Sequence, residues 1–178
     1  MNTSVTGANN NQQSNTSDAQ AVLAKLSAPF DVDVIRVKPG PLSRSGKAKV
    51  HLYVDARAVI DRLNAVLGFN WQFAWESVPL PDGKIGVRGR LTIRLSDTLV
   101  CTREDAGEAS DEMEALKSAV SDALKRTSVQ FGVGRFLYDM PDMWWSYDAQ
   151  TKRFSEPDQL MAAVTKVLKS RLNGSHGE

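Results

Sequence analysis

The chain has 178 residues, which is room for one compact domain with tails, and 42% of them are hydrophobic, enough for a buried core. The formal net charge is +1, which excludes a uniformly basic protein that coats nucleic acid, so a polyanion site needs basic residues gathered in one place. The single cysteine, Cys101, excludes disulfides within the chain, and with only two histidines we expect no metal site, cofactor or catalytic histidine.

The N-terminal segment, residues 1–17, carries no charge and consists mostly of Asn, Gln, Ser and Thr, so we expect a disordered polar tail. Order is expected from Ser17, because its spacing from Gln20 matches a capping box, and Pro29 ends the short helix that follows. The start also lacks the basic and apolar stretches of a signal peptide, and no apolar run reaches the roughly 18 residues of a membrane span. These features predict a cytoplasmic protein that does not contact membranes.

The next segment predicts a short strand at residues 31–35 and a loop at residues 38–49, which is marked by prolines and glycines. Apolar residues then recur at helical spacing over residues 55–67, and Gly68 follows where a helix ends. Beyond it, aromatic residues alternate with smaller ones, which indicates a strand whose aromatic face lies in the core: Phe69, Trp71, Phe73 and Trp75.

Residues 87–95 alternate again between apolar and basic side chains, and residues 99–103 return the chain after a turn at residues 96–98. We therefore expect an antiparallel meander with one packed face and one polar face. A second long helix is predicted from about Asp111 to Val129, and Gly132 and Gly134 end it. Residues 141–147 read as a loop, and a final amphipathic helix begins near Ser155. The predicted parts are the tail at 1–17, a domain at 18–150 and a C-terminal helix with its tail at 151–178.

Basic residues gather in three places, although the chain is nearly neutral. The segment from Val34 to Val54 contains no acidic residue, one face of the strand at 87–95 is basic, and the second long helix ends on a basic pair. This pattern suits a groove lined by one sign of charge, and ordinary solvent-exposed charge explains it equally well. Three aromatic residues outside the expected core are candidates for stacking on bases: Tyr53, Trp144 and Trp145.

An acidic run offers an alternative from another class. Glu104, Asp105 and Glu108 could hold magnesium in a nuclease, although negative charge close to the start of a helix is favoured without any metal. A second alternative is an accessory protein-binding module, in which the Trp144–Trp145 loop or the last helix docks onto a repair partner.

Several ordered segments resemble the Rad-fifty-two type single-strand annealing family. They are residues 53–64 and 67–71, residues 103–107, and above all residues 115–126 with 130–132. The resemblance extends from Val50 to about Met140, and the length and terminal segments look most like a bacterial DNA-damage-response member of the family.

The resemblance implies an α+β fold in which an antiparallel β-meander packs on a long helix, a β-β-β-α core with helices at both ends of the chain. It further implies protomers that form a ring, with single-stranded DNA in a basic groove around it. Such proteins are not enzymes: they bind single strands in DNA repair, protect ends and promote annealing without ATP. Expected partners are single-stranded DNA, further copies of the chain and other repair proteins, in a nucleoid-associated setting.

Lys125 and Arg126 match the basic pair that lines the groove in this family. Other positions depart from the pattern: Arg57 stands one position early, Val129 replaces an arginine and Ser96 replaces a lysine. Spacing alone, rather than the resemblance, suggests that the strand arginines take over phosphate contacts. The complete set of predicted DNA-binding residues is Lys125, Arg126, Arg57, Arg88, Arg90, Arg94, Arg44, Lys47 and Lys49.

Overall fold

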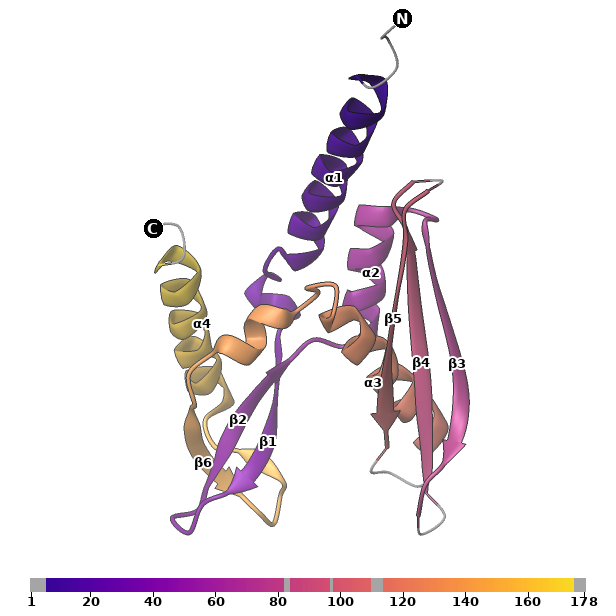
Figure 1. Ribbon diagram of the computed structural model, residues 1–178. Helices are drawn as coiled ribbons and strands as arrows, with labels where there is room; N and C mark the ends of the chain where they lie inside the picture. Colours follow the sequence, from indigo (N-terminus) through magenta and orange to yellow (C-terminus); the bar gives the residue numbers. More distant parts are fainter. Residues whose placement is uncertain (1–5, 82–83, 97, 110–113, 175–178) are drawn as a thin grey trace, which may run out of the picture. The chain divides into compact units, whose positions relative to one another are not determined.

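A computed structural model describes residues 6–174 apart from 82–83, 97 and 110–113 (Figure 1). The chain divides into two compact units that alternate along the sequence. The meander unit consists of Met1–Ala28 and Ala56–Val133, and the hairpin unit consists of Pro29–Asp55 and Gly134–Glu178. The division into parts at residues 17/18 and 150/151 stays a prediction.

The meander unit contains the antiparallel sheet that the alternating pattern predicted. Its strands follow one another in the order β3-β4-β5, and helix α3 lies along one face of the sheet (Figure 1). Their bounds are β3 Trp71–Pro79, β4 Ile85–Arg94, β5 Val100–Glu108 and α3 Ala115–Val129. The predicted β-β-β-α arrangement is therefore present in a mixed α+β fold, while the predicted helix start at Asp111 lies outside the described residues.

The face of β4 toward α3 is closely packed. Val87, Leu91 and Ile93 are each at most 1% exposed, as the period-two pattern predicted. A β-carbon on Gly107 would lie 2.2 Å from the carbonyl oxygen of Ala119, so only glycine lets α3 come this close to β5. The approach of helix and sheet leaves no open surface between them at these positions.

The predicted aromatic core is wrong in part. Phe69 is fully exposed and Trp75 is 47% exposed. Phe69 precedes β3 in the turn made by Gly68, whose φ is 58°, and α3 packs mainly on β4 and β5, which leaves the β3 edge largely uncovered. Trp71 is half-buried, and its indole Nε1 donates to the Asn64 side-chain oxygen at 2.9 Å, which joins β3 to the preceding helix.

Two helices complete the meander unit. Helix α2 (Ala56–Leu67) confirms the predicted helix, and its buried residues are Val59, Leu63 and Leu67. Helix α1 (Thr6–Ser27) begins earlier than predicted, so residues 6–17 are helical rather than disordered. The prediction weighed burial alone, whereas an existing helix extends by local backbone hydrogen bonds that need no core. Arg62 donates to the backbone oxygens of Lys25 and Leu26, at 3.3 and 3.2 Å, and holds the end of α1 against α2.

The hairpin unit contains a sheet that the sequence did not predict. Residues 32–34 form a single 3-10 turn rather than a strand, and the expected loops at 38–49 and 141–147 are largely strands. Pro39 and Pro41 lie in the edge strand of this sheet, where a missing N–H costs no ladder bond. The order is β1-β2-β6-β7, with bounds β1 Arg36–Leu42, β2 Lys47–Tyr53, β6 Trp144–Asp148 and β7 Arg153–Phe154.

Helix α4 (Pro157–Gly174) confirms the predicted C-terminal helix, and Leu160, Val164 and Leu168 on its apolar face are buried. A short 3-10 helix, η3 (Arg135–Asp139), follows the glycine turn at Gly132 and Gly134, whose φ values of 93° and 71° suit glycine. None of the described helices combines the length and apolar character that crossing a membrane requires.

Candidate nucleic-acid interface

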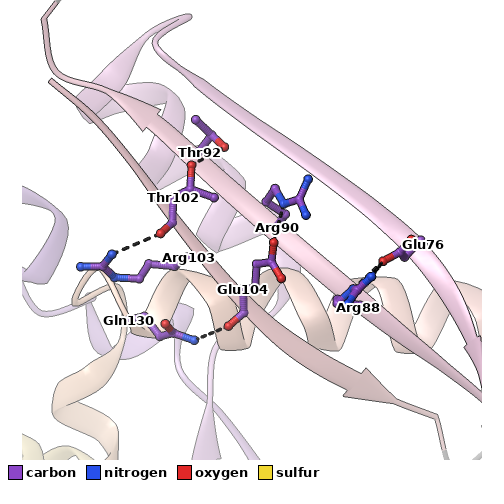
Figure 2. Close-up of polar contacts among 8 residues, drawn as sticks. All are labelled: Glu76, Arg88, Arg90, Thr92, Thr102, Arg103, Glu104 and Gln130. Carbon is purple, nitrogen blue, oxygen red and sulfur yellow. Dashed lines mark hydrogen bonds and ion pairs between the residues drawn. The ribbon is translucent and has the colours of Figure 1, made fainter. Parts of the chain in front are cut away.

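The exposed face of the meander sheet carries two of the predicted strand arginines, and both meet a carboxylate. Arg88 pairs with Glu76 on β3, and the Arg90 Nε lies 2.6 Å from Glu104 Oε1 on β5 (Figure 2). Each pair joins residues directly opposite in the strand register. The carboxylates of Glu76 and Glu104 therefore neutralise the charges of Arg88 and Arg90 on this face. The face points away from α3.

Arg94 and Arg57 belong to the same unit but stand outside these pairs. Arg94 lies at the end of β4 opposite Val100, and Arg57 lies in the first turn of α2. Both are exposed, and neither forms an ion pair with a residue that the structure describes.

Helix α3 brings the predicted basic pair, Lys125 and Arg126, together near its C-terminal end. The Lys125 Nζ is 3.6 Å from Asp122 Oδ1, and the Arg126 Nη2 is 3.0 Å from Asp105 Oδ1 on β5. Half of the Arg126 side chain remains exposed. Because α3 covers one face of the sheet and Arg88 and Arg90 point from the other, the helix pair and these strand arginines lie on opposite sides of the sheet.

Asp105 is held by several donors at once. Its carboxylate accepts from the Arg126 Nε at 3.0 Å, from the Gln130 amide at 3.1 Å and from the Ala106 backbone N–H at 2.8 Å. Partial burial raises the pKa of this carboxyl, but these hydrogen bonds and the charge of Arg126 outweigh the burial and hold the pKa below its usual value. Asp105 is therefore ionised at neutral pH and orients the guanidinium of Arg126.

Two neighbours of this site were not among the sequence candidates. The Gln130 amide also donates to the backbone oxygen of Glu104 at 2.9 Å, and the Arg103 guanidinium lies 5.6 Å from the centre of the Phe131 ring (Figure 2 shows Gln130 and Arg103). The alternation along β5 places Arg103 on the same face as Asp105, toward α3, and this alternation is a sequence signal that could have singled out Arg103.

The hairpin unit carries the remaining predicted basic residues. The Lys49 Nζ pairs with Asp142 Oδ1 at 2.6 Å. Arg44 in the turn between β1 and β2 and Lys47 at the start of β2 are both exposed, and no described carboxylate pairs with either. These cations belong to the hairpin unit, whereas Lys125 and Arg126 belong to the meander unit.

The acidic residues do not form the metal cluster of the nuclease alternative. Glu104 and Asp105 are consecutive on β5, so their side chains point to opposite faces, where they pair with Arg90 and Arg126. Among the described residues, no group of three or more histidine, cysteine or acidic side chains is placed to hold a metal ion.

The accessory-module alternative needs the Trp144–Trp145 segment or the last helix to be available to a partner. Parts of both segments instead make contacts within the chain. Trp145 lies in β6 rather than in a loop, and its indole Nε1 donates to the Ser155 backbone oxygen at 2.8 Å. Leu160, Val164 and Leu168 of α4 are buried as well.

Comparison with known proteins decides the family. The family description "Rad52/22 family double-strand break repair protein" matches residues 18–154, which include both strands of the hairpin, the meander and α3. The chain belongs to this Rad52/22 family. The resemblance inferred from residues 53–71, 103–107 and 115–132 is thereby confirmed.

Two similar proteins carry the name single-stranded DNA-binding protein DdrA. The one from Deinococcus deserti is 43% identical over 143 residues, which cover 77% of this chain and 67% of the relative. The one from Deinococcus radiodurans is 44% identical over 129 residues, which cover 71% of this chain and 59% of the relative. The match therefore spans about two thirds of one relative and less of the other.

Proposed function

We propose that this protein binds single-stranded DNA during DNA repair and holds the strand by its phosphates. The observation that carries the proposal is the basic pair Lys125–Arg126 on α3 in a chain of the Rad52/22 family, whose relatives are named for binding single strands. Contacts to phosphates are independent of sequence and leave the base edges open for pairing. We assign no catalytic role to the chain, and its place of action is the nucleoid.

The ion pairs on α3 are compatible with this role. Lys125 pairs with Asp122 and Arg126 pairs with Asp105, and ion pairs between partly exposed side chains contribute about 0–1 kcal/mol. A phosphate can therefore displace Asp122 from Lys125 at little cost, and it can join the exposed half of Arg126 while Asp105 keeps its hydrogen bonds. The charge-assisted hydrogen bonds that Arg126 makes with Asp105 also hold its guanidinium in place before DNA binds.

The proposal includes end protection and annealing without ATP. A strand held by its phosphates has its bases ready to meet a complementary strand. Duplex formation supplies roughly 1.4 kcal/mol for each base-pair step, so annealing needs no nucleotide hydrolysis.

The proposal also includes self-association into a ring. The meander sheet has two edge strands, β3 and β5, and such edges pair readily with other chains. Large apolar side chains are exposed in the same unit, among them Phe69, Trp75 and Leu116. Repetition of Lys125 and Arg126 around a ring would produce the continuous basic groove that the resemblance implies.

Titration of a fluorescent oligo-dT with the full chain, over a range of salt concentrations, tests this function. Lys125→Ala and Arg126→Ala should each weaken binding, and each should lower the slope of log affinity against log salt by about 0.7 because one phosphate contact is lost. Lys117→Ala is the matched control, because Lys117 lies on the same helix, is 79% exposed and pairs with Glu114. Binding that does not change with salt, or wild-type affinity in both variants, contradicts the proposal.

A further inference from the structure

The face of the meander sheet that packs on α3 carries a further cation, Arg103 on the edge strand β5. Arg103 stands opposite Leu91 in the β4–β5 register, and Leu91 is fully buried. Because residues directly opposite each other in antiparallel strands share a face, Arg103 extends from the α3 side of the sheet. Its side chain is nevertheless exposed, so it lies at the margin of the area that α3 covers.

An aromatic ring holds the Arg103 guanidinium close to the end of α3. The Arg103 Cζ lies 5.6 Å from the centre of the Phe131 ring, and Phe131 is buried just beyond the last residue of α3. The Arg103 Nη1 also donates to the backbone oxygen of Thr102 at 3.1 Å (Figure 2). Both contacts restrict the position of the guanidinium, and both leave its positive charge in place because neither partner is an anion.

Arg126 lies beside Arg103 because both reach the same stretch of β5. Arg103 and Asp105 are two residues apart on this strand, so their side chains leave it on the same face, about 6.5 Å apart. The Arg126 Nη2 is 3.0 Å from Asp105 Oδ1. The guanidinium groups of Arg103 and Arg126 are therefore neighbours on the α3 side of the sheet.

The nearest acidic residues along β5 are engaged by groups other than Arg103. Asp105 Oδ1 accepts from Arg126, and Asp105 Oδ2 accepts from the Gln130 amide. Glu104 leaves the strand on the opposite face, because successive side chains alternate. Within the part of the chain that the structure describes, no carboxylate forms an ion pair with Arg103.

Arg103 therefore gives this region an excess of positive charge. Asp122 lies 3.6 Å from the Lys125 Nζ and offsets part of its charge. Asp105 does the same for Arg126. No described carboxylate does so for Arg103, and a cation of this kind contributes most to the attraction of a polyanion.

We propose that Arg103 is a third phosphate-binding residue of the Lys125–Arg126 site, where the DNA strand passes from the end of α3 onto the edge strand β5. An exposed guanidinium presents several N–H donors in a planar fork, which suits phosphate oxygens. Phe131 and the Thr102 oxygen orient Arg103 before DNA binds, which lowers the cost of ordering it. This role rests on the proposed function for its ligand, and it adds a residue outside the predicted DNA-binding set.

Titration of fluorescent oligo-dT with the full chain, over a range of salt concentrations, tests the role of Arg103. Arg103→Ala should bind about two- to fivefold more weakly, as for loss of one exposed ion pair, and should lower the slope of log affinity against log salt by about 0.7. Arg103→Lys keeps the charge and should keep the wild-type slope. Arg153→Ala is the matched control, because it removes an exposed arginine from β7 in the other unit, and it should leave the slope unchanged.

A purely structural role for Arg103 predicts a different result. If the guanidinium only fastens β5 to Phe131, Arg103→Ala should lower the melting temperature and leave the salt slope at its wild-type value. Arg103→Gln removes the charge but keeps a long polar side chain, so it provides a second neutral variant if the alanine variant folds poorly. Circular dichroism and thermal melting of every variant measure the folding.

Two results distinguish failure of this role from failure of the proposed function. If the wild-type chain does not bind oligo-dT at low salt, the proposed function fails, and the role of Arg103 fails with it. If the wild type binds and Lys125→Ala lowers the slope, but folded Arg103→Ala or Arg103→Gln keeps the wild-type slope, Arg103 is overturned as a phosphate contact while the function stands. A slope in Arg103→Lys as low as that in Arg103→Ala also overturns the phosphate contact.

Discussion

The two sheets of this protein both carry basic residues on an exposed face, and they differ in what stands opposite those residues. On the meander sheet, Arg88 and Arg90 face glutamates on the neighbouring strands. On the hairpin sheet, Lys47 faces Ser146 and Lys49 faces Trp144. A cation with a carboxylate directly across adds little to the electrostatic field at a distance, whereas Lys47, with which no described carboxylate pairs, keeps its attraction for phosphate. Lys49 lies between these cases because it pairs with Asp142.

Helix α3 stands between these two cases. Lys125 and Arg126 have acidic neighbours, but Arg126 shares Asp105 with Gln130 and a backbone N–H, so this carboxylate serves more than one donor. The partners of a basic residue, rather than its presence in the sequence, therefore decide how strongly it attracts a polyanion.

The comparison depends first on the packing of α3 against one face of the meander sheet, because this packing leaves the opposite face of the sheet as its exposed face. Gly107→Ala should destabilise the protein by about 1–3 kcal/mol, because the new β-carbon would meet the backbone of α3 at Ala119. Urea denaturation measures the change. Ala106→Val, on the opposite and exposed face of the same strand, is the control and should stay within about 0.5 kcal/mol of the wild type. A Gly107→Ala protein as stable as the wild type contradicts the close approach.

The comparison depends next on Asp105, whose carboxylate holds the guanidinium of Arg126 in place. The folded-state pKa of Asp105 is lowered, so the carboxylate contributes stability above its unfolded pKa and loses that contribution as pH falls through the folded value. Asp105→Asn should therefore lower stability at pH 7 by about 1–2 kcal/mol, because hydrogen bonds to a charged group contribute about 1.5–3 kcal/mol and the partial exposure of Arg126 weakens them. Thermal melting should show the gap between wild type and variant shrinking toward pH 3. A gap of constant size from pH 7 to pH 3 rules out this role.

The smallest expected effect on DNA binding comes from removing a carboxylate that pairs with a basic residue on either sheet. Asp142 in the hairpin unit and Glu104 on the meander sheet are the two such carboxylates to compare. Asp142→Asn releases Lys49 on β2 and should tighten oligo-dT binding by about two- to fivefold, as for loss of one competing surface ion pair. Glu104→Gln releases Arg90 on the meander sheet and should leave the affinity near that of the wild type. Fluorescence anisotropy at low salt measures both. Tighter binding in Glu104→Gln alone would place the DNA on the meander sheet instead.

Much of the meander unit could be predicted from the sequence, because its signals are local. Apolar spacing and Gly68 define α2, and alternation over residues 87–95 defines β4 with its buried and basic faces. The segment around Lys125 and Arg126 also carries the family resemblance that the comparison confirms.

The hairpin unit and the charge pairing could not be predicted, because both depend on which strands lie side by side. Pro39 and Gly40 are loop signals in the sequence, yet an edge strand tolerates them. The opposition of Arg90 and Glu104 follows from the register across the β4–β5 turn, which sequence alone does not specify. Trp144 and Lys49 are 95 residues apart and meet only through the pairing of β2 with β6.

Photo-crosslinking of the full chain to oligo-dT, with adducts mapped by mass spectrometry, tests most directly where the strand lies. Our account predicts adducts on peptides of β2 and β6 that contain Lys47 and Trp144, and on the end of α3 at Lys125 and Arg126. Adducts confined to the exposed face of the meander sheet, around Arg88 and Arg90, would contradict it.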